Sequence, residues 1–363
     1  MSAKSFLRDP GNWLVGLIVF FPVAVVLQLK EAPPLYAFAA AALAIVPLAE
    51  LIGRSTEALA HHAGPGVGGL LNATLGNAAE LIIALMLLRS GQLDVVKASL
   101  TGSIIGNLLL VLGFAFFAAG LKFEAPTFNA TAAESSAATL ILAVIAMLVP
   151  AVFHGAEREA SLSVLSELSI GIALILIAVY VAGLVFSLKT HKHLFQGDEA
   201  DAQAKDEKPP MGLPAALAVL AAATGAVVWM SEILARTVES ASLALHLSHT
   251  FVGMVIVAIV GNAAEHSTAV MMARKGKMDL AIGIAVESSK QIALFVAPAL
   301  VLLSLVLAPE PMTLEFTTME VVSVVAATGI VTVVVLDGKT NWLEGVQLVA
   351  VYAVLAVVFF FMP

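Results

Sequence analysis

Apolar runs recur along the whole chain, and charged residues, prolines and glycines interrupt them at short intervals. A transmembrane helix needs about 20 predominantly apolar residues, and most of these runs reach that length. The pattern therefore predicts an all-α polytopic membrane protein with about eleven transmembrane helices. The predicted spans are 12–29, 35–53, 66–88, 93–120, 132–153, 165–188, 213–238, 250–273, 278–307, 318–336 and 342–362.

The composition of the 363 residues agrees with a membrane protein. Apolar residues make up 60% of the chain and charged residues 12%, against roughly 25% charged residues in a soluble domain, and the mean hydropathy is +1.00. A large soluble domain is therefore excluded, and the lipid bilayer is the expected surrounding. The net charge of −8 argues against nucleic acid as a partner. The absence of cysteine excludes thiolate metal sites and thiol catalysis.

An internal repeat divides the chain into two halves. Residues 76–94 and 261–279 share ten of nineteen positions, including Gly-Asn-Ala-Ala-Glu at the start of each segment. Each half contains five predicted spans, so the sequence predicts one leading helix followed by two five-helix repeats of opposite orientation. Inverted repeats are typical of secondary transporters, with the substrate site between them near the midplane, although channels also use repeats. The predicted domains are an N-terminal segment with the first helix (1–33), the first repeat (34–188), an acidic linker (189–212) and the second repeat (213–363).

The distribution of basic residues predicts the orientation in the membrane. With eleven spans, twelve of the 18 Lys and Arg residues fall on the side of the N-terminus and five on the other side, and Lys290 lies inside a span. Because cytoplasmic loops carry an excess of Lys and Arg, we expect a cytosolic N-terminus, a cytosolic acidic linker and an external C-terminus. The short loops suit the inner membrane of a prokaryotic cell.

Glu80 and Glu265 lie well inside predicted spans, at matching positions of the repeat. A carboxylate inside a membrane is costly and by default marks an ion or proton pathway. Inverted symmetry would bring the two residues together, and two carboxylates match a divalent cation such as Ca²⁺, which takes about 6–8 oxygen ligands. Without the cation the carboxylates repel each other, so protons compete with the metal for the same oxygens. The structural alternative is that both glutamates hydrogen-bond to helix backbones.

Asparagine and glycine accompany both glutamates. Asn77 and Asn262 lie three residues before them, on the same helix face. Gly76 and Gly261 would let each helix loosen and expose backbone carbonyl oxygens towards an ion. The sequence therefore predicts a cation- and proton-binding site formed by these four residues and the two glutamates, with the glutamates as direct metal ligands.

Several motifs resemble those of a known family. The segments GNAAELI and GNAAEH, together with GKMDLAIGIA and QIALFVAP, are similar to motifs of the calcium/proton antiporter branch of the cation/calcium exchanger superfamily. Gly102-Ser103-Ile104-Ile105-Gly106-Asn107 resembles a further motif of that branch. The resemblance implies one leading helix, two inverted five-helix repeats and an acidic cytosolic segment between them. It also implies that Glu80 and Glu265 are the central ligands for cation and proton.

One segment departs from the pattern of this family. Where the second repeat usually reads Gly-Ser-x-x-Gln, this chain has Glu287, Ser288 and Gln291, with Lys290 between the last two. In a regular helix Glu287 can pair with Lys290 at i, i+3, which would be a self-neutralising structural pair. The alternatives are a third carboxylate for the cation, or an ammonium group that weakens cation binding.

Other polar residues of the predicted spans have two interpretations each. Ser103, Asn107, Ser288 and Gln291 either line the cavity or join neighbouring helices through hydrogen bonds. His266 follows Glu265 and could tune its protonation, although neighbouring residues of a helix point apart. A spaced set of charges occurs in both halves and either modulates ion access or forms pairs within one helix: Glu50, Arg54 and Glu57, and Glu232, Arg236 and Glu239.

These observations predict a secondary active antiporter that exports Ca²⁺ from the cytosol in exchange for protons. Ca²⁺ is then the transported substrate, and no cofactor is expected. A sodium- or potassium-coupled exchanger of the same superfamily is the nearest alternative, and a cation channel is a more distant one. The sequence contains no HExxH or GxSxG motif that would favour a membrane enzyme. The oligomeric state is open, with a homo-oligomer among the options.

Overall fold

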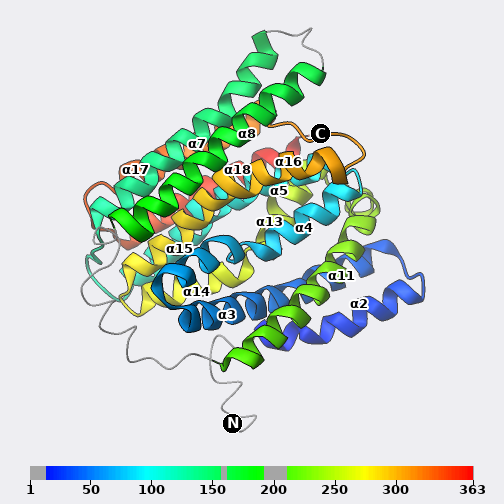
Figure 1. Cartoon of the computed structure of the whole chain (residues 1–363), viewed down its shortest axis with the longest axis horizontal. Helices are drawn as coiled ribbons and strands as arrows, with labels where there is room; N and C mark the ends of the chain where they lie inside the picture. The colour runs from blue at the N-terminus through cyan, green and yellow to red at the C-terminus, as the bar shows by residue number, and fades with distance from the viewer. Residues whose placement is uncertain (1–13, 157–161, 192–210, 363) are drawn as a thin grey trace.

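In a computed structural model, residues 14–156, 162–191 and 211–362 are described, and they form a bundle of long helices (Figure 1). These ranges contain no β-strand, and Thr127 and Lys339 form an isolated bridge. The predicted all-α fold is therefore confirmed. A helix satisfies its backbone hydrogen bonds internally, which a chain in a lipid bilayer requires. Most of the predicted acidic linker, 192–210, lies outside the described residues.

Eight helices in the described ranges are long and apolar enough to cross a membrane. The pair His249–Gly261 and Ala263–Arg274, which is bent by 59°, would make a ninth span. Shorter apolar helices, Gly16–Leu29 and Thr318–Val334, occupy the remaining two predicted spans. Every predicted span thus contains a helix. Eleven crossings are not confirmed, because the two shorter helices fall below the usual length for a hydrocarbon core of about 30 Å.

The helices follow the same order in both halves, after η2 (Leu14–Val19) and α2 (Phe20–Leu29). The segments η3, η5 and η6 are π-helical turns, a feature that is frequent near functional sites. The first half contains α3 (Pro34–Leu75), α4 (Ala78–Arg89), α5 (Leu93–Ile105), η3 (Gly106–Val111), α6 (Leu112–Gly120), α7 (Ala130–Ala156), α8 (Leu162–Val185) and η4 (Phe186–Thr190). The second half contains α11 (Leu213–Leu245), α12 (His249–Phe251), η5 (Val252–Val257), α13 (Ala258–Gly261), α14 (Ala263–Arg274), α15 (Met278–Gln291), η6 (Ile292–Val296), α16 (Ala297–Leu307), α17 (Thr318–Val334) and α18 (Trp342–Phe361).

The helix α3 is longer than the sequence predicted. The predicted span 35–53 ends too early, because the helix continues to Gly64, where a φ of 80° interrupts it. Glycine adopts this backbone conformation without steric cost. The charges that suggested an end do not stop the helix, since Arg54 donates to Glu50 over 2.6 Å within it. Beyond the interruption the chain is helical again to Leu75.

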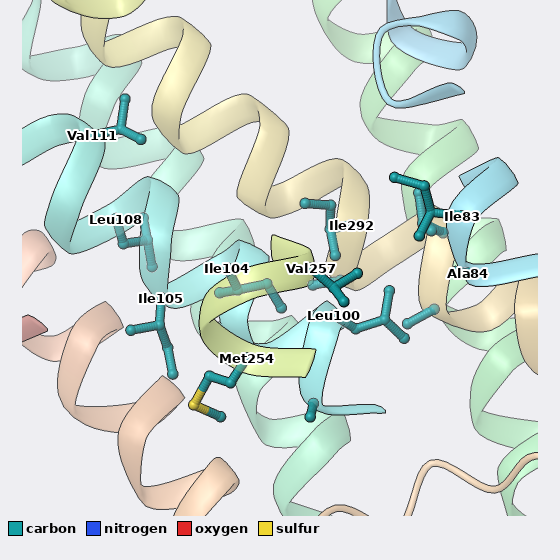
Figure 2. Close-up of a cluster of buried hydrophobic side chains, with 14 of the residues drawn as sticks. Ile83, Ala84, Leu100, Ile104, Ile105, Leu108, Val111, Met254, Val257 and Ile292 are labelled. Atoms are coloured by element: carbon teal, nitrogen blue, oxygen red, sulfur yellow. The ribbon is translucent and has the colours of Figure 1, made fainter. Parts of the chain in front are cut away.

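Buried apolar side chains from both halves pack together in one cluster (Figure 2). Ile83 and Leu100 come from the first half, and Met254 and Val257 come from the second. Each of these four side chains is at most 3% exposed. In lipid, helices associate through van der Waals packing and interhelical hydrogen bonds, so this cluster holds the two halves together.

Small residues bring α5 and η5 into backbone contact beside this cluster. A Cβ atom built on Gly102 of α5 would lie 2.1 Å from the carbonyl oxygen of Met254. A Cβ atom built on Gly253 of η5 would lie 2.6 Å from the carbonyl oxygen of Val95. Glycine at both positions therefore permits an approach that any side chain would prevent.

Candidate cation site

A cavity of about 400 Å³ opens between the two halves of the fold. Glu80 of α4, Glu265 of α14 and Glu287 of α15 all line it. Glu80 is buried, with 9% of its surface exposed, and Glu265 is partly buried. The two glutamates of the repeat therefore face one common space. Further lining residues are Glu50, Arg54, Glu57, Asn72, Gly76, Gly261, Thr268, Ser288 and Gln291.

Two matching helix interruptions position these glutamates. Asn77 has φ −98° and ψ 28°, and Asn262 has φ −94° and ψ 7°, so each asparagine stands between two helices. The helices α4 and α14 begin at the next residue and carry Glu80 and Glu265 in their first turns. The positive end of a helix dipole stabilises an anionic side chain in its first turn. The preceding helices end nearby, and their terminal carbonyl groups lack partners within the helix. Each Gly-Asn step of the repeat therefore coincides with an interruption between two helices.

The glycines of the repeat lie where one half crosses the other. A Cβ atom built on Gly261 would lie 3.3 Å from Cγ of Glu80. A Cβ atom built on Gly76 would lie 3.7 Å from Oε1 of Gln291. Each glycine thus faces a predicted site residue of the opposite half, and its lack of a side chain leaves room for that residue.

Amide and hydroxyl groups from both halves form a buried network beside the glutamates. Asn77 Nδ2 donates to Gln291 Oε1 over 2.7 Å, and Ser288 Oγ donates to Asn77 Oδ1 over 3.0 Å. Asn107 Nδ2 reaches Ser288 Oγ at 2.9 Å and Asn262 Oδ1 at 3.1 Å. Because every bond links residues that are more than 150 positions apart, the network fixes the two halves relative to each other.

The same network contacts one carboxylate and Ser103. Asn262 Nδ2 donates to Ser103 Oγ over 2.8 Å, and Asn107 Nδ2 lies 3.5 Å from Glu265 Oε2. Asn107 is fully buried, and its Oδ1 atom has no hydrogen-bond partner among the described residues. The arrangement thus offers two carboxylates, with amide and hydroxyl oxygens close by. Oxygen atoms of these types are the preferred ligands of a hard divalent cation.

A much smaller crevice of about 10 Å³ lies on the other side of Glu80. Ser99, Ser103 and Val257 line it together with Glu80 and Gly261. The two copies of the repeat begin at Gly76 and Gly261, which are 185 positions apart. At this offset Ser103 corresponds to Ser288, and Val257 corresponds to Asn72. Ser288 and Asn72 both line the large cavity. The two spaces are therefore equivalent regions of the two halves, one of about 400 Å³ and one of about 10 Å³. Such a crevice holds about one water molecule at most.

Glu287 and Lys290 form the pair that their spacing allows. Lys290 Nζ donates to Glu287 Oε1 over 2.6 Å and lies 2.5 Å from Oε2. Ser136 Oγ of α7 also donates to Oε1 over 2.6 Å. The pair is therefore intrahelical, but Glu287 lines the cavity as well.

The spaced charges of the two halves have different surroundings. The Arg236–Glu232 pair, at 2.5 Å, repeats the Arg54–Glu50 pair, so both are i, i+4 pairs within one helix. Glu57 is exposed and lines the cavity. Glu239 is exposed, and it is not among the described residues that line the cavity. The charges of the first half therefore lie at the cavity and those of the second half do not.

His266 and three further polar residues differ in whether they lie at the cavity. His266 is partly buried and is not among the described residues that line the cavity. Asn72, Thr268 and Ser136 were not predicted as parts of the site. Asn72 and Thr268 line the cavity, and Ser136 contacts Glu287. Their positions depend on which helix faces share the cavity, and the apolar pattern does not contain that information.

The described residues contain no group of three His, Cys, Asp or Glu side chains that could hold a metal ion. In the described conformation Glu287 therefore does not join Glu80 and Glu265 in one metal-ligating group, and the candidate site rests on two carboxylates and on neutral oxygens.

Comparisons with known proteins place the chain in a family. Residues 34–189 and 215–361 match the profile of the family described as "Sodium/calcium exchanger protein". A Ca(2+)/H(+) antiporter of Bacillus subtilis, ChaA, is 45% identical over 93% of this chain and 96% of its own length. A Ca(2+)/H(+) antiporter of Aphanothece halophytica is 42% identical over 96% of both chains. The crystal structure of the Ca2+/H+ antiporter protein YfkE superposes with a TM-score of 0.84, at 40% identity over 97% of this chain and 100% of that one. The chain belongs to the sodium/calcium exchanger protein family.

Proposed function

We propose that this protein is a secondary active antiporter that exchanges Ca²⁺ for protons. The carrying observation is that Glu80 and Glu265 face one cavity from matching helix interruptions of the two halves. Support comes from relatives of 42% and 45% identity that are named Ca(2+)/H(+) antiporters and match nearly their whole length. The protein is thus a transporter rather than an enzyme.

The chemistry of exchange follows from charge balance at the two glutamates. One Ca²⁺ ion neutralises both carboxylates, and so do two protons. Without either, two like charges would stand together in surroundings of low dielectric constant, which is unfavourable. The site is therefore occupied by cation or by protons in turn, and the competition for the same oxygens couples the two fluxes.

Alternating access requires that the site open to one side at a time. The cavity next to Glu80 and Glu265 has a volume of about 400 Å³, whereas the equivalent crevice beside Glu80 has about 10 Å³ and lies next to the contact of α5 with η5. Exchanging the conformations of the two halves would close the cavity and open the crevice. Inverted repeats provide this exchange, because each half can adopt the conformation of the other.

The proposal includes the division of the chain into repeats and its orientation in the membrane. We assign 34–188 and 213–363 to repeats of opposite orientation, after an N-terminal helix and on either side of the acidic linker. The excess of basic residues supports a cytosolic N-terminus and an external C-terminus, and Arg54, which lines the cavity, is one of the residues counted on the cytosolic side. The protein then exports Ca²⁺ across the inner membrane of a prokaryotic cell, driven by inward proton flow.

Transport by the purified protein in lipid vesicles tests this function. An acidic lumen in sodium-free buffer should drive Ca²⁺ uptake, and the lumen should become alkaline in step. The Glu80→Gln variant should lose both fluxes, because only one of the two central carboxylates then remains. Glu124→Gln, at an exposed residue of the loop after α6, is the matched control and should leave both unchanged. Uptake that requires sodium would favour the sodium-coupled alternative, and a current without proton movement would favour a channel.

A further inference from the structure

The cavity contains a third carboxylate with a resident counterion. The Glu287 side chain is 38% exposed and lines the cavity, whereas the Lys290 side chain is 18% exposed and is absent from the described cavity lining. The ammonium group of Lys290 lies within 2.6 Å of both carboxylate oxygens, and Ser136 donates to one of them. Glu287 is therefore neutralised by Lys290 while its side chain lines the cavity.

Glu287 stands close to the network that supports the central site. It directly precedes Ser288, which bonds to Asn77 and accepts from Asn107. One helical turn later, Gln291 accepts from Asn77. A cation in the cavity therefore experiences the fields of three carboxylates, and one of these is masked by Lys290.

The equivalent position in the other half has no side chain. At the spacing of the repeat, Glu287 corresponds to Gly102, which is in contact with the backbone of Met254. The position of Lys290 corresponds to Ile105, which is buried and apolar. The acidic residue and its counterion are thus present on the side of the cavity and missing on the side of the crevice.

We propose that the Glu287–Lys290 pair sets the affinity with which the site binds divalent cations from the cavity side. Ca²⁺ carries twice the charge of the ammonium group and takes about 6–8 oxygen ligands, more than two carboxylates supply. Ca²⁺ in the cavity draws Glu287 away from Lys290 and uses it as a third carboxylate, and Lys290 takes Glu287 back when the ion leaves. Because Gly102 offers no such group, the cavity side binds Ca²⁺ more tightly than the opposite side. This inference rests on the proposed exchange of Ca²⁺ for protons.

Two single substitutions should change the affinity in opposite directions. Lys290→Met keeps the aliphatic length but frees Glu287, so the KM for Ca²⁺ on the cavity side should fall. Glu287→Gln removes the carboxylate and leaves the ammonium group unmasked, so the KM should rise by about tenfold, equivalent to about 1.4 kcal/mol. The double variant Glu287→Gln/Lys290→Met should lie between them. If the pair had only a structural role, both single substitutions would lower the amount of folded protein and would not shift the KM in opposite directions.

Everted membrane vesicles expose the cytosolic face and allow these KM values to be measured under an imposed pH gradient. Ca²⁺-dependent thermal stabilisation of the purified variants provides a second readout that does not require transport. Opposite shifts in both measurements support the proposal, and shifts in one direction, or none, overturn it. If the wild type exchanges Ca²⁺ for protons and the variants have the same KM as the wild type, this inference is refuted and the proposed function stands. Absence of proton-coupled uptake in the wild type would instead refute the proposed function.

Discussion

The contact between α5 and η5 leads to a prediction about the side of the site where the small crevice lies. In the substitution Gly102→Ala, the new Cβ atom would lie 2.1 Å from the carbonyl oxygen of Met254 and 2.6 Å from its carbonyl carbon. Under the proposed alternating access, opening the crevice separates α5 from η5, so the substitution should selectively destabilise the closed state. Overpacking of this kind typically destabilises a packed structure by about 1–3 kcal/mol. The population of the closed state should therefore fall by about 5- to 150-fold relative to the open state.

Labelling of a single introduced cysteine can measure this population, because the chain contains no cysteine of its own. A single cysteine introduced by Ser99→Cys would lie at the crevice, where Ser99 is 7% exposed. A membrane-impermeant thiol reagent should label it slowly in the parent protein and faster, by about the same factor, when Gly102→Ala is added. Ca²⁺/proton exchange should slow in parallel, because one of the two alternating states has become unfavourable.

Gly106→Ala is the matched control, since no atom lies within 4 Å of a Cβ built on Gly106. It should change neither labelling nor exchange. If Gly102→Ala left labelling at position 99 and the exchange rate unaltered, the α5–η5 contact would not be the closed gate. If the control changed them as strongly, the effect would come from helix propensity rather than from the clash.

Two further predictions concern stability and proton competition. Tyr180 is buried and donates to the carbonyl oxygen of Ala73 over 2.6 Å, close to the interrupted end of α3. Tyr180→Phe should destabilise the protein by about 1–3 kcal/mol, since that carbonyl loses its partner. Thermal unfolding should show a lower Tm, whereas Tyr36→Phe, at a residue that is 62% exposed, should not. Acidifying the cavity side should raise the KM for Ca²⁺, because protons occupy Glu80 and Glu265. A KM that is constant across pH in initial-rate measurements would contradict shared carboxylates.

The sequence predicts the centre of this fold well because the same motif occurs in both halves. Two copies of Gly-Asn-Ala-Ala-Glu locate both helix interruptions, and a carboxylate inside an apolar span is costly enough to be informative. The positions of Glu80 and Glu265 at one cavity follow from these two facts. The length of α3 does not follow, because Glu50 and Arg54 neutralise each other and the helix continues through them.

The surroundings of the site depend on tertiary packing. Ser136 meets Glu287 because α7 lies beside α15, and Asn107 meets Asn262 because the halves cross. Such contacts join residues that are 151 and 155 positions apart, and no local pattern encodes them. The sequence could therefore name the polar residues of the spans but not decide which of them line the cavity.

The inequality of the two spaces beside Glu80 also has an electrical consequence. A water-filled cavity of this size would carry the electrical potential of its own side to the glutamates, so the transmembrane voltage would fall mainly across α5 and η5, which line the small crevice. Moving one elementary charge through 100 mV changes its energy by about 2.3 kcal/mol. A displacement of the ion by a few ångströms, past α5 and η5, would then traverse most of the field. The voltage sensitivity of transport would reside in the separation of α5 from η5 rather than in the long approach to them.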